Sequence, residues 1–212
     1  MRIVFASSLA LLAAIHAAPL GAQGAPAEAA RLCADVKQSP DARVEACTRA
    51  IESGLYKDRA LSALYTNRAA IHRRAGSFDR AEDDIAAALR HNPANDIAQT
   101  VRGNINFNLR RFDESILDYD RAIKINPQRW DAYIGRALAH YESGNYQLAI
   151  NDWTRLLAKQ PSANGYTDRA NAHYMLGQYE QAVQDYDRAL RLEPTHADAG
   201  KYRAEALKML GR

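Results

Sequence analysis

Arginines and aspartates recur at one interval along most of this 212-residue chain. The arginines follow one another at intervals of 33 or 34 residues: Arg68, Arg102, Arg136, Arg169 and Arg203. The aspartates follow at the same intervals: Asp84, Asp118, Asp152 and Asp185. A row of arginines could bind anions, but the fork of a guanidinium also fits a carboxylate. Because the two rows share one period, we predict an internal ladder of structural ion pairs.

The sequence is compatible with two registers of this ladder, because there are five arginines for four aspartates. If each pair forms within one repeat, Arg203 has no aspartate of its own. If each aspartate instead pairs with the next arginine along the chain, Asp185 binds Arg203 and Arg68 is left over.

Histidines occupy a third repeated position, where His72, His140 and His173 occur and Asn106 fills the gap. Metal ligands must converge on one ion, whereas residues one repeat apart are separated by about 10 Å, the distance between packed helices. We therefore predict hydrogen-bonded core histidines and no metal site. The sequence also lacks G-x-S-x-G, a glycine-rich phosphate loop and H-E-x-x-H, so we predict neither an enzyme nor a cofactor.

The first residues predict export. Arg2 precedes an apolar run that ends near Ala18, and small residues follow, which is typical of a secretory signal. We predict a signal peptide over residues 1–22, cleaved after Ala22. The alternative is an uncleaved membrane anchor, but the run is shorter than the roughly 20 residues that span a bilayer. We therefore expect an exported, periplasmic protein with no membrane insertion after cleavage.

Cys33 and Cys47 are the only cysteines. They lie seven residues either side of Pro40, at the predicted bend between two antiparallel helices, and so would face each other. Two buried free thiols are the alternative, but disulfides form and persist in exported proteins. We predict a disulfide between Cys33 and Cys47.

Charge and composition exclude other classes of partner. The chain is 47% hydrophobic and 25% charged, as expected for a folded soluble protein, and its net charge is +3. Loss of Arg2 with the signal would leave 27 basic and 25 acidic residues, a net charge of +2. Because basic residues are spread along the chain rather than clustered, we predict no nucleic-acid binding.

The elements that carry these rows are pairs of helices. In residues 62–95, apolar residues recur at spacings of three and four, as one face of a helix requires. Gly76 ends the first helix, and a second apolar stripe runs from Phe78 to just before Pro93. The terminal proline returns at positions 127, 161 and 194. A fixed period of this length indicates a repeat architecture.

These units resemble the tetratricopeptide repeat family. With Pro93 at position 32 of the 34-residue unit, the first unit matches with Tyr65, Ala69, Gly76, Phe78, Ala81 and Ala88. The second unit departs with Gln99, Arg110 and Ser115. The resemblance implies an all-α fold: a right-handed α-solenoid of stacked antiparallel helix pairs with a C-terminal capping helix. The predicted parts are a degenerate helical pair (23–61), four units (62–95, 96–129, 130–162 and 163–196) and the capping helix (197–212).

In this family, positions 2, 5, 9, 12 and 13 of the first helices line a concave groove for extended peptides. The resemblance therefore implies these partner-binding residues: Thr100, Asn104, Phe107, Ile134, Leu138, Tyr141, Thr167, Asn171 and Tyr174. The alternative is that the aromatic residues at position 12 serve only to stack the units. The lysines with which chaperone-adaptor members clamp a carboxylate are absent at these positions.

The resemblance implies a non-catalytic adaptor or scaffold whose partner is another protein or an extended peptide segment. Self-assembly through the ends of the solenoid is the alternative. The sequence leaves the oligomeric state open.

Overall fold

The computed structural model describes residues 24–212, which form eleven α-helices and no strand. The predicted signal peptide lies outside the described residues. The helices are α1 (Ala25–Ala34), α2 (Pro40–Glu52), α3 (Asp58–Arg74), α4 (Phe78–His91), α5 (Asp96–Asn108), α6 (Phe112–Ile125), α7 (Trp130–Glu142), α8 (Tyr146–Leu157), α9 (Ala163–Met175), α10 (Tyr179–Leu192) and α11 (Ala197–Met209). None of the helices in the described part of the chain is long and apolar enough to cross a membrane.

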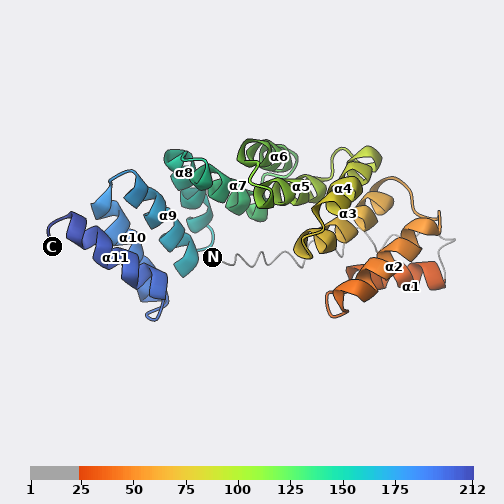
Figure 1. The fold of residues 1–212 in the computed structure, drawn as a ribbon, viewed down its shortest axis with the longest axis horizontal. Helices are drawn as coiled ribbons and strands as arrows, with labels where there is room; N and C mark the ends of the chain where they lie inside the picture. Colours follow the sequence, from red (N-terminus) through yellow and green to blue (C-terminus); the bar gives the residue numbers. More distant parts are fainter. Residues whose placement is uncertain (1–23) are drawn as a thin grey trace.

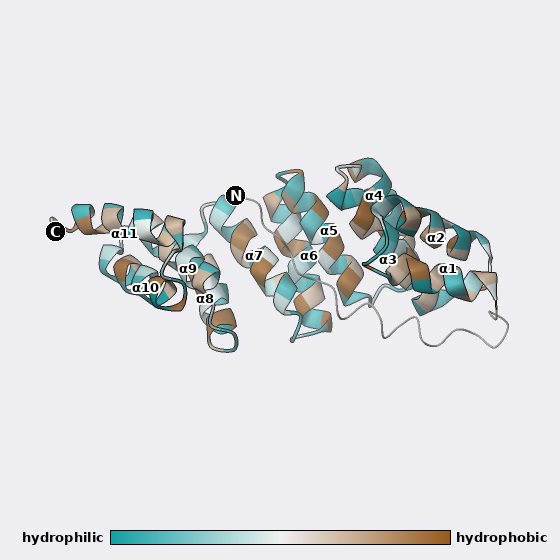
Figure 2. Cartoon of the chain, turned by 90° about the horizontal axis from the view of Figure 1, so that it is seen from below, coloured by the Kyte–Doolittle hydropathy of each residue, from teal (hydrophilic) through white to brown (hydrophobic). Residues whose placement is uncertain are grey.

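Each helix packs against its neighbours in the sequence, so the pairs follow one another from α1 at one end of the molecule to α11 at the other (Figure 1). We call α3, α5, α7 and α9 the first helices, and α4, α6, α8 and α10 the second helices. First helices also contact one another, since α3 contacts α5 and α5 contacts α7. Apolar and polar residues alternate around each helix (Figure 2). The buried apolar residues form a series of core clusters along the stack of helices.

Glycines in the left-handed conformation end three of the four first helices. Gly76, Gly144 and Gly177 have φ angles of 75°, 80° and 73°. Arg110 takes this place in the second unit with φ of 59°, although a side chain disfavours this conformation. Its guanidinium lies 5.2 Å from the ring centre of Phe112, so the side chain is held over the start of α6. The turn of the second unit is therefore retained without glycine.

Helix α3 begins at Asp58, four residues before the predicted start of the first unit. The additional turn contains Ala60 and Leu61, which pack against the N-terminal core cluster. The apolar contact with the preceding pair extends this helix beyond the 34-residue repeat.

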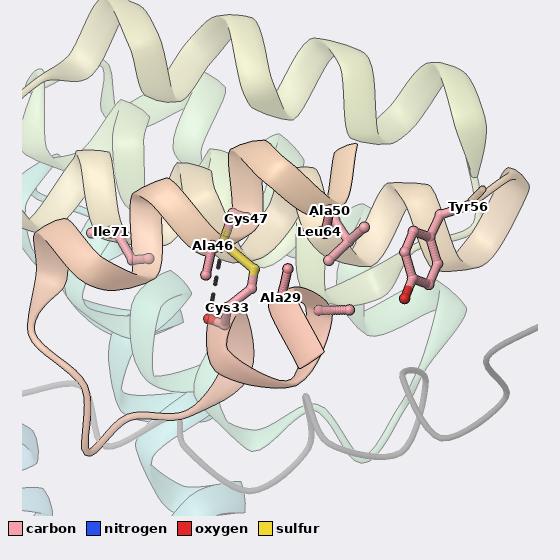
Figure 3. Packing of buried hydrophobic residues seen from close by; sticks show 9 residues of the cluster. Ala29, Cys33, Ala46, Cys47, Ala50, Tyr56, Leu64 and Ile71 are labelled. Carbon is pink, nitrogen blue, oxygen red and sulfur yellow. Dashed lines mark hydrogen bonds between the residues drawn. A yellow bond between two sulfur atoms is a disulfide. The ribbon is translucent and has the colours of Figure 1, made fainter. Parts of the chain in front are cut away.

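Helices α1 and α2 form the N-terminal pair. Ser39 accepts a hydrogen bond from the backbone N–H of Ala42 and caps α2. Cys33 and Cys47 are fully buried between the two helices, with their sulfur atoms 2.06 Å apart, at disulfide distance (Figure 3). Tyr56 and Leu64 complete the cluster and connect it to α3.

A close approach in the core of the second and third units predicts a large packing effect. A Cβ atom at Gly135 would overlap Cζ of Tyr119, whose side chain is fully buried. We expect Gly135→Ala to lower the free energy of unfolding by about 1 to 3 kcal/mol, as for other overpacked cores. Gly200→Ala is the matched control, because nothing lies within 4 Å of its Cβ. Urea unfolding should show this control to be neutral or stabilising by about 0.5 to 1 kcal/mol. Equal effects of the two substitutions would contradict the close packing.

Candidate functional site

The arginine and aspartate rows meet within each repeat. Arg68 donates hydrogen bonds to both oxygens of Asp84, at 2.9 and 2.7 Å. The equivalent pairs are Arg102 with Asp118, Arg136 with Asp152, and Arg169 with Asp185. Each pair joins a first helix to the second helix of the same unit. The structure therefore has the within-repeat register.

The same arginines also reach backward to the preceding unit. Arg136 binds Asp120 at 2.5 Å, and Arg169 donates to the hydroxyl of Thr154 at 3.1 Å. Arg203, which has no aspartate of its own unit, binds Asp187 at 2.5 Å. In each of these contacts the acceptor, Asp120, Thr154 or Asp187, lies two residues after the aspartate of the preceding unit. The ladder therefore connects successive units as well as the two helices of each unit.

Asp118 accepts hydrogen bonds from three different residues, more than any other aspartate of the row. Its side chain, only 3% exposed, accepts hydrogen bonds from Arg102 at 2.7 Å, Asn106 at 2.9 Å and Arg121 at 2.8 Å. Asn106 thus takes the place of the repeated histidine by hydrogen-bonding the buried carboxylate. Charge-assisted hydrogen bonds of this kind are the strong ones in protein interiors.

The repeated histidines lie in or near the core. Burial lowers the pKa of His72 and His140, which favours their neutral forms. His72 lies 3.9 Å from a carboxylate oxygen of Asp84, and Nδ1 of His173 lies 2.6 Å from the side-chain oxygen of Gln178. No group of three or more potential ligands could hold a metal ion within residues 24–212.

The nine predicted partner-binding residues divide into two layers. Five are half-buried and lie on the first helices: Phe107, Ile134, Tyr141, Asn171 and Tyr174. We call these five residues the aromatic face. The other four are buried: Thr100, Asn104, Leu138 and Thr167. The structure therefore places these four residues beneath the surface that the aromatic face forms.

Hydrogen bonds within each helix explain the burial of the two threonines. The hydroxyl of Thr100 donates to the carbonyl of Asp96 at 2.8 Å, and that of Thr167 donates to the carbonyl of Ala163 at 2.9 Å. Neither hydroxyl is therefore available as a donor to a bound segment.

The aromatic residues at position 12 each contact the first residue of the following second helix. The ring centres of Tyr141 and Tyr146 lie 5.4 Å apart with an edge-to-face geometry. Phe107 pairs in the same way with Phe112, at 5.6 Å, and Tyr174 pairs with Tyr179, at 5.2 Å. These contacts fix the rings while leaving part of each ring exposed.

Comparisons with known proteins agree with this architecture. A family model described as a tetratricopeptide repeat matches residues 163–196, and a second model of the same description matches residues 66–129 and 108–165. The chain belongs to the tetratricopeptide repeat family. This result confirms the predicted family and the all-α solenoid fold. No curated protein matches the sequence.

Solved tetratricopeptide repeat structures resemble this chain along most of its length. A tetratricopeptide repeat protein from Parabacteroides merdae is 22% identical, with a TM-score of 0.73, over 88% of this chain and 74% of that one. The Cut9–Hcn1 hetero-tetramer of APC/C contains a chain that is 16% identical, with a TM-score of 0.72; the match covers 86% of this chain but only 35% of that one. The first repeat domain of Spaghetti (RPAP3), bound to the HSP90 peptide SRMEEVD, is 25% identical, with a TM-score of 0.51, over 55% of this chain and 96% of that domain.

Two tyrosine hydroxyls that the predicted site did not include fix two amides of the tetratricopeptide repeats. The hydroxyl of Tyr119 donates to Asn104 at 2.7 Å, and that of Tyr186 donates to Asn171 at 2.7 Å. The signal was present in the repeats, since positions 9 and 24 vary together: Ala70 with Ile85, Asn104 with Tyr119, Leu138 with Trp153, and Asn171 with Tyr186. An amide occurs only where the facing residue carries a hydroxyl. The two amide oxygens therefore accept hydrogen bonds from tyrosines of their own units.

Proposed function

We propose that this protein is a non-catalytic adaptor or scaffold that binds an extended segment of another protein on the aromatic face. The observation that carries this proposal is the row of half-buried rings on consecutive first helices: Phe107, Tyr141 and Tyr174. Aromatic rings of this kind provide a large contact area at a small loss of conformational entropy.

The related Spaghetti (RPAP3) domain binds an HSP90 peptide, which supports a peptide as the type of partner. We expect the bound segment to differ from the HSP90 peptide, because this chain lacks the chaperone-adaptor lysines at the groove positions of its first helices. The proposal places the adaptor in the cell envelope, most simply the periplasm. The N-terminal apolar run and the cysteine pair at disulfide distance support this location.

Tyr141 lies between the other two rings in the row and is expected to anchor the segment. Truncation of an aromatic residue near the middle of an interface often costs 2 kcal/mol or more, a loss of about 30-fold in affinity. We therefore expect Tyr141→Ala to weaken binding by at least this factor. Isothermal titration calorimetry with an extended peptide, selected from a displayed library on the folded protein, measures the change.

Leu148→Ala is the matched control, since Leu148 is an apolar residue on a second helix and is 48% exposed. Circular dichroism should show that both variants keep their helices. Equal affinities of the parent protein and Tyr141→Ala would remove the aromatic face from the proposed function.

A further inference from the structure

Helix α11 is built like the first helix of a further unit. It packs on α10 and α9 at one end of the stack (Figure 1), as α5 packs on α4 and α3. Gly211 follows it with a φ angle of 73°, the same angle as Gly177 after α9. The backbone N–H of Arg212 donates to the carbonyl of Leu207 at 3.0 Å, and the equivalent hydrogen bond closes each of the four first helices at 2.8 to 2.9 Å. The turn that leads into a second helix is therefore formed, but within residues 24–212 no second helix follows it.

The face of α11 that a second helix would cover is open. In three earlier units the equivalent residues, Ala69, Ala137 and Ala170, are fully buried in clusters with residues of their own second helices. Ala204 holds this position in α11 and is exposed. A Cβ atom at Gly200, one turn earlier, would meet nothing within 4 Å. The same surface is therefore covered in the earlier units and uncovered in α11.

Arg203 lies beside this face and lacks the contact that defines its row. In Arg68 and Arg169, Nε and Nη2 bind both carboxylate oxygens of the aspartate on the second helix of the same unit. In Arg203, Nε donates instead to Asp187 of the preceding unit. Its two terminal amino groups make no hydrogen bond to any residue of the described part of the chain, and 40% of the side chain is exposed. The guanidinium can therefore accommodate a further carboxylate.

Arg136 shows how one arginine holds both kinds of carboxylate. Its Nε and Nη2 bind Asp152 at 2.8 and 2.6 Å, while Nη1 binds Asp120 of the preceding unit at 2.5 Å. Asp187 occupies the position equivalent to Asp120. Arg203 can thus keep Asp187 through Nη1 and bind a carboxylate from a covering helix through Nε and Nη2.

We propose that α11 binds a helix of another protein in the place of a second helix, with a carboxylate of that helix paired to Arg203. Ala204 and the half-buried Leu207 supply the apolar part of the contact. The site lies at the end of the stack, so the proposal goes beyond the aromatic face and does not depend on it.

The four second helices show the chemistry that the occupant needs. Each contains a small residue, an aspartate three residues later, and directly after it an isoleucine, tyrosine or tryptophan: 81–85, 115–119, 149–153 and 182–186. In a second copy of this chain, these helices are already packed on their own first helices. The occupant is therefore an amphipathic helix of a different protein that carries an acidic residue in this pattern.

The test uses a synthetic peptide with the sequence of residues 177–194, held helical by a hydrocarbon staple between positions 180 and 184, which are exposed in α10. Isothermal titration calorimetry should detect binding to the parent protein. Arg203→Gln should weaken it at least about tenfold, because a charge-assisted contact is lost. Lys208→Gln is the matched control, since it removes the same charge from an exposed position of the same helix. The control should change the affinity by less than about twofold.

Two further changes test the pairing and its place. A peptide with asparagine in place of its aspartate should bind the parent as weakly as the original peptide binds Arg203→Gln. Ala204→Trp should block binding, because the equivalent alanines have no exposed surface when a second helix covers them. Lys208→Trp should not block it. Circular dichroism should show that these variants keep their helices, as expected for exposed positions.

The outcomes separate this inference from the proposed function. If the stapled peptide does not bind, or binds the parent, Arg203→Gln and Ala204→Trp equally, the helix site on α11 is overturned. A dimer of the parent, detected by sedimentation velocity and lost in Ala204→Trp, would assign the face to a second copy and overturn the proposed occupant. Tyr141→Ala should bind the stapled peptide as the parent does, so neither result bears on the aromatic face.

Discussion

Asp118→Ala is expected to lower the free energy of unfolding by about 3 kcal/mol, the low end of the range for breaking a buried ion pair from one side, because the side chain of Arg102 is 32% exposed. The carboxylate is almost fully buried and accepts hydrogen bonds from three side chains. Its removal leaves the side-chain N–H group of Asn106 without this acceptor, and leaves the guanidinium of Arg102 with only the side-chain oxygen of Gln99. Urea unfolding of the variant, monitored by circular dichroism, measures this loss.

A double-mutant cycle separates the pair from general damage to the core. Asp118→Ala and Arg102→Ala should be strongly non-additive, because each substitution removes the same contact. Arg136→Ala is the matched control, since Arg136 pairs with Asp152 and Asp120 rather than with Asp118. A larger coupling of Asp118 with Arg136 than with Arg102 would contradict the within-repeat register. Additive effects near zero would show that the ladder does not stabilise the fold.

Replacing both Cys33 and Cys47 by alanine is expected to lower the free energy of unfolding of the N-terminal helix pair by about 3 kcal/mol. The covalent link closes a loop with a sequence separation of 14, which restricts the unfolded chain. Both side chains are fully buried, so alanine is the less disruptive replacement. Hydrogen exchange followed by mass spectrometry should show faster exchange in α1 and α2. Exchange in α7 to α10 should be unchanged, because each pair contacts only its neighbours.

The predicted disulfide can also be measured without a variant. Mass spectrometry of the non-reduced mature protein should find one protein mass that is two hydrogens lower than that of the reduced form. Two alkylatable thiols in protein isolated from its native compartment would contradict the pairing. They would also remove one of the two supports for export.

The sequence was sufficient for the family and the all-α fold, because the period is repeated four times. The glycine and the proline that mark helix ends in the first unit, Gly76 and Pro93, have equivalents at the same positions of later units. The apolar residues have the spacing of one helix face. The residue type alone does not predict the turn at Arg110, since this arginine adopts the left-handed conformation that glycine usually adopts. The repeated context on both sides determines this turn more strongly than the residue itself.

The register of the ladder could not be predicted from the sequence, because the arginines and aspartates have the same spacing in both registers. Each arginine has several donors, and the structure uses them in two directions. Arg136 binds Asp152 of its own unit and Asp120 of the preceding one. The observed arrangement therefore contains contacts within a repeat and between repeats.

The candidate site could be predicted only in part, because the exposure of a residue depends on its neighbours from other helices. Asn104 occupies the same position as Asn171, yet Asn104 is buried and Asn171 is half-buried.

Photo-cross-linking gives the most direct test of binding on the aromatic face. Benzoylphenylalanine is placed at Tyr141 or Tyr174 and, as controls, at Leu117 or Leu148, which are exposed on second helices. Each protein is irradiated with the selected peptide, and the adducts are quantified by mass spectrometry. Adducts from the two tyrosine positions and none from the leucine positions are the predicted result. Equal or stronger cross-linking from the leucine positions would contradict the proposal that the aromatic face binds the partner.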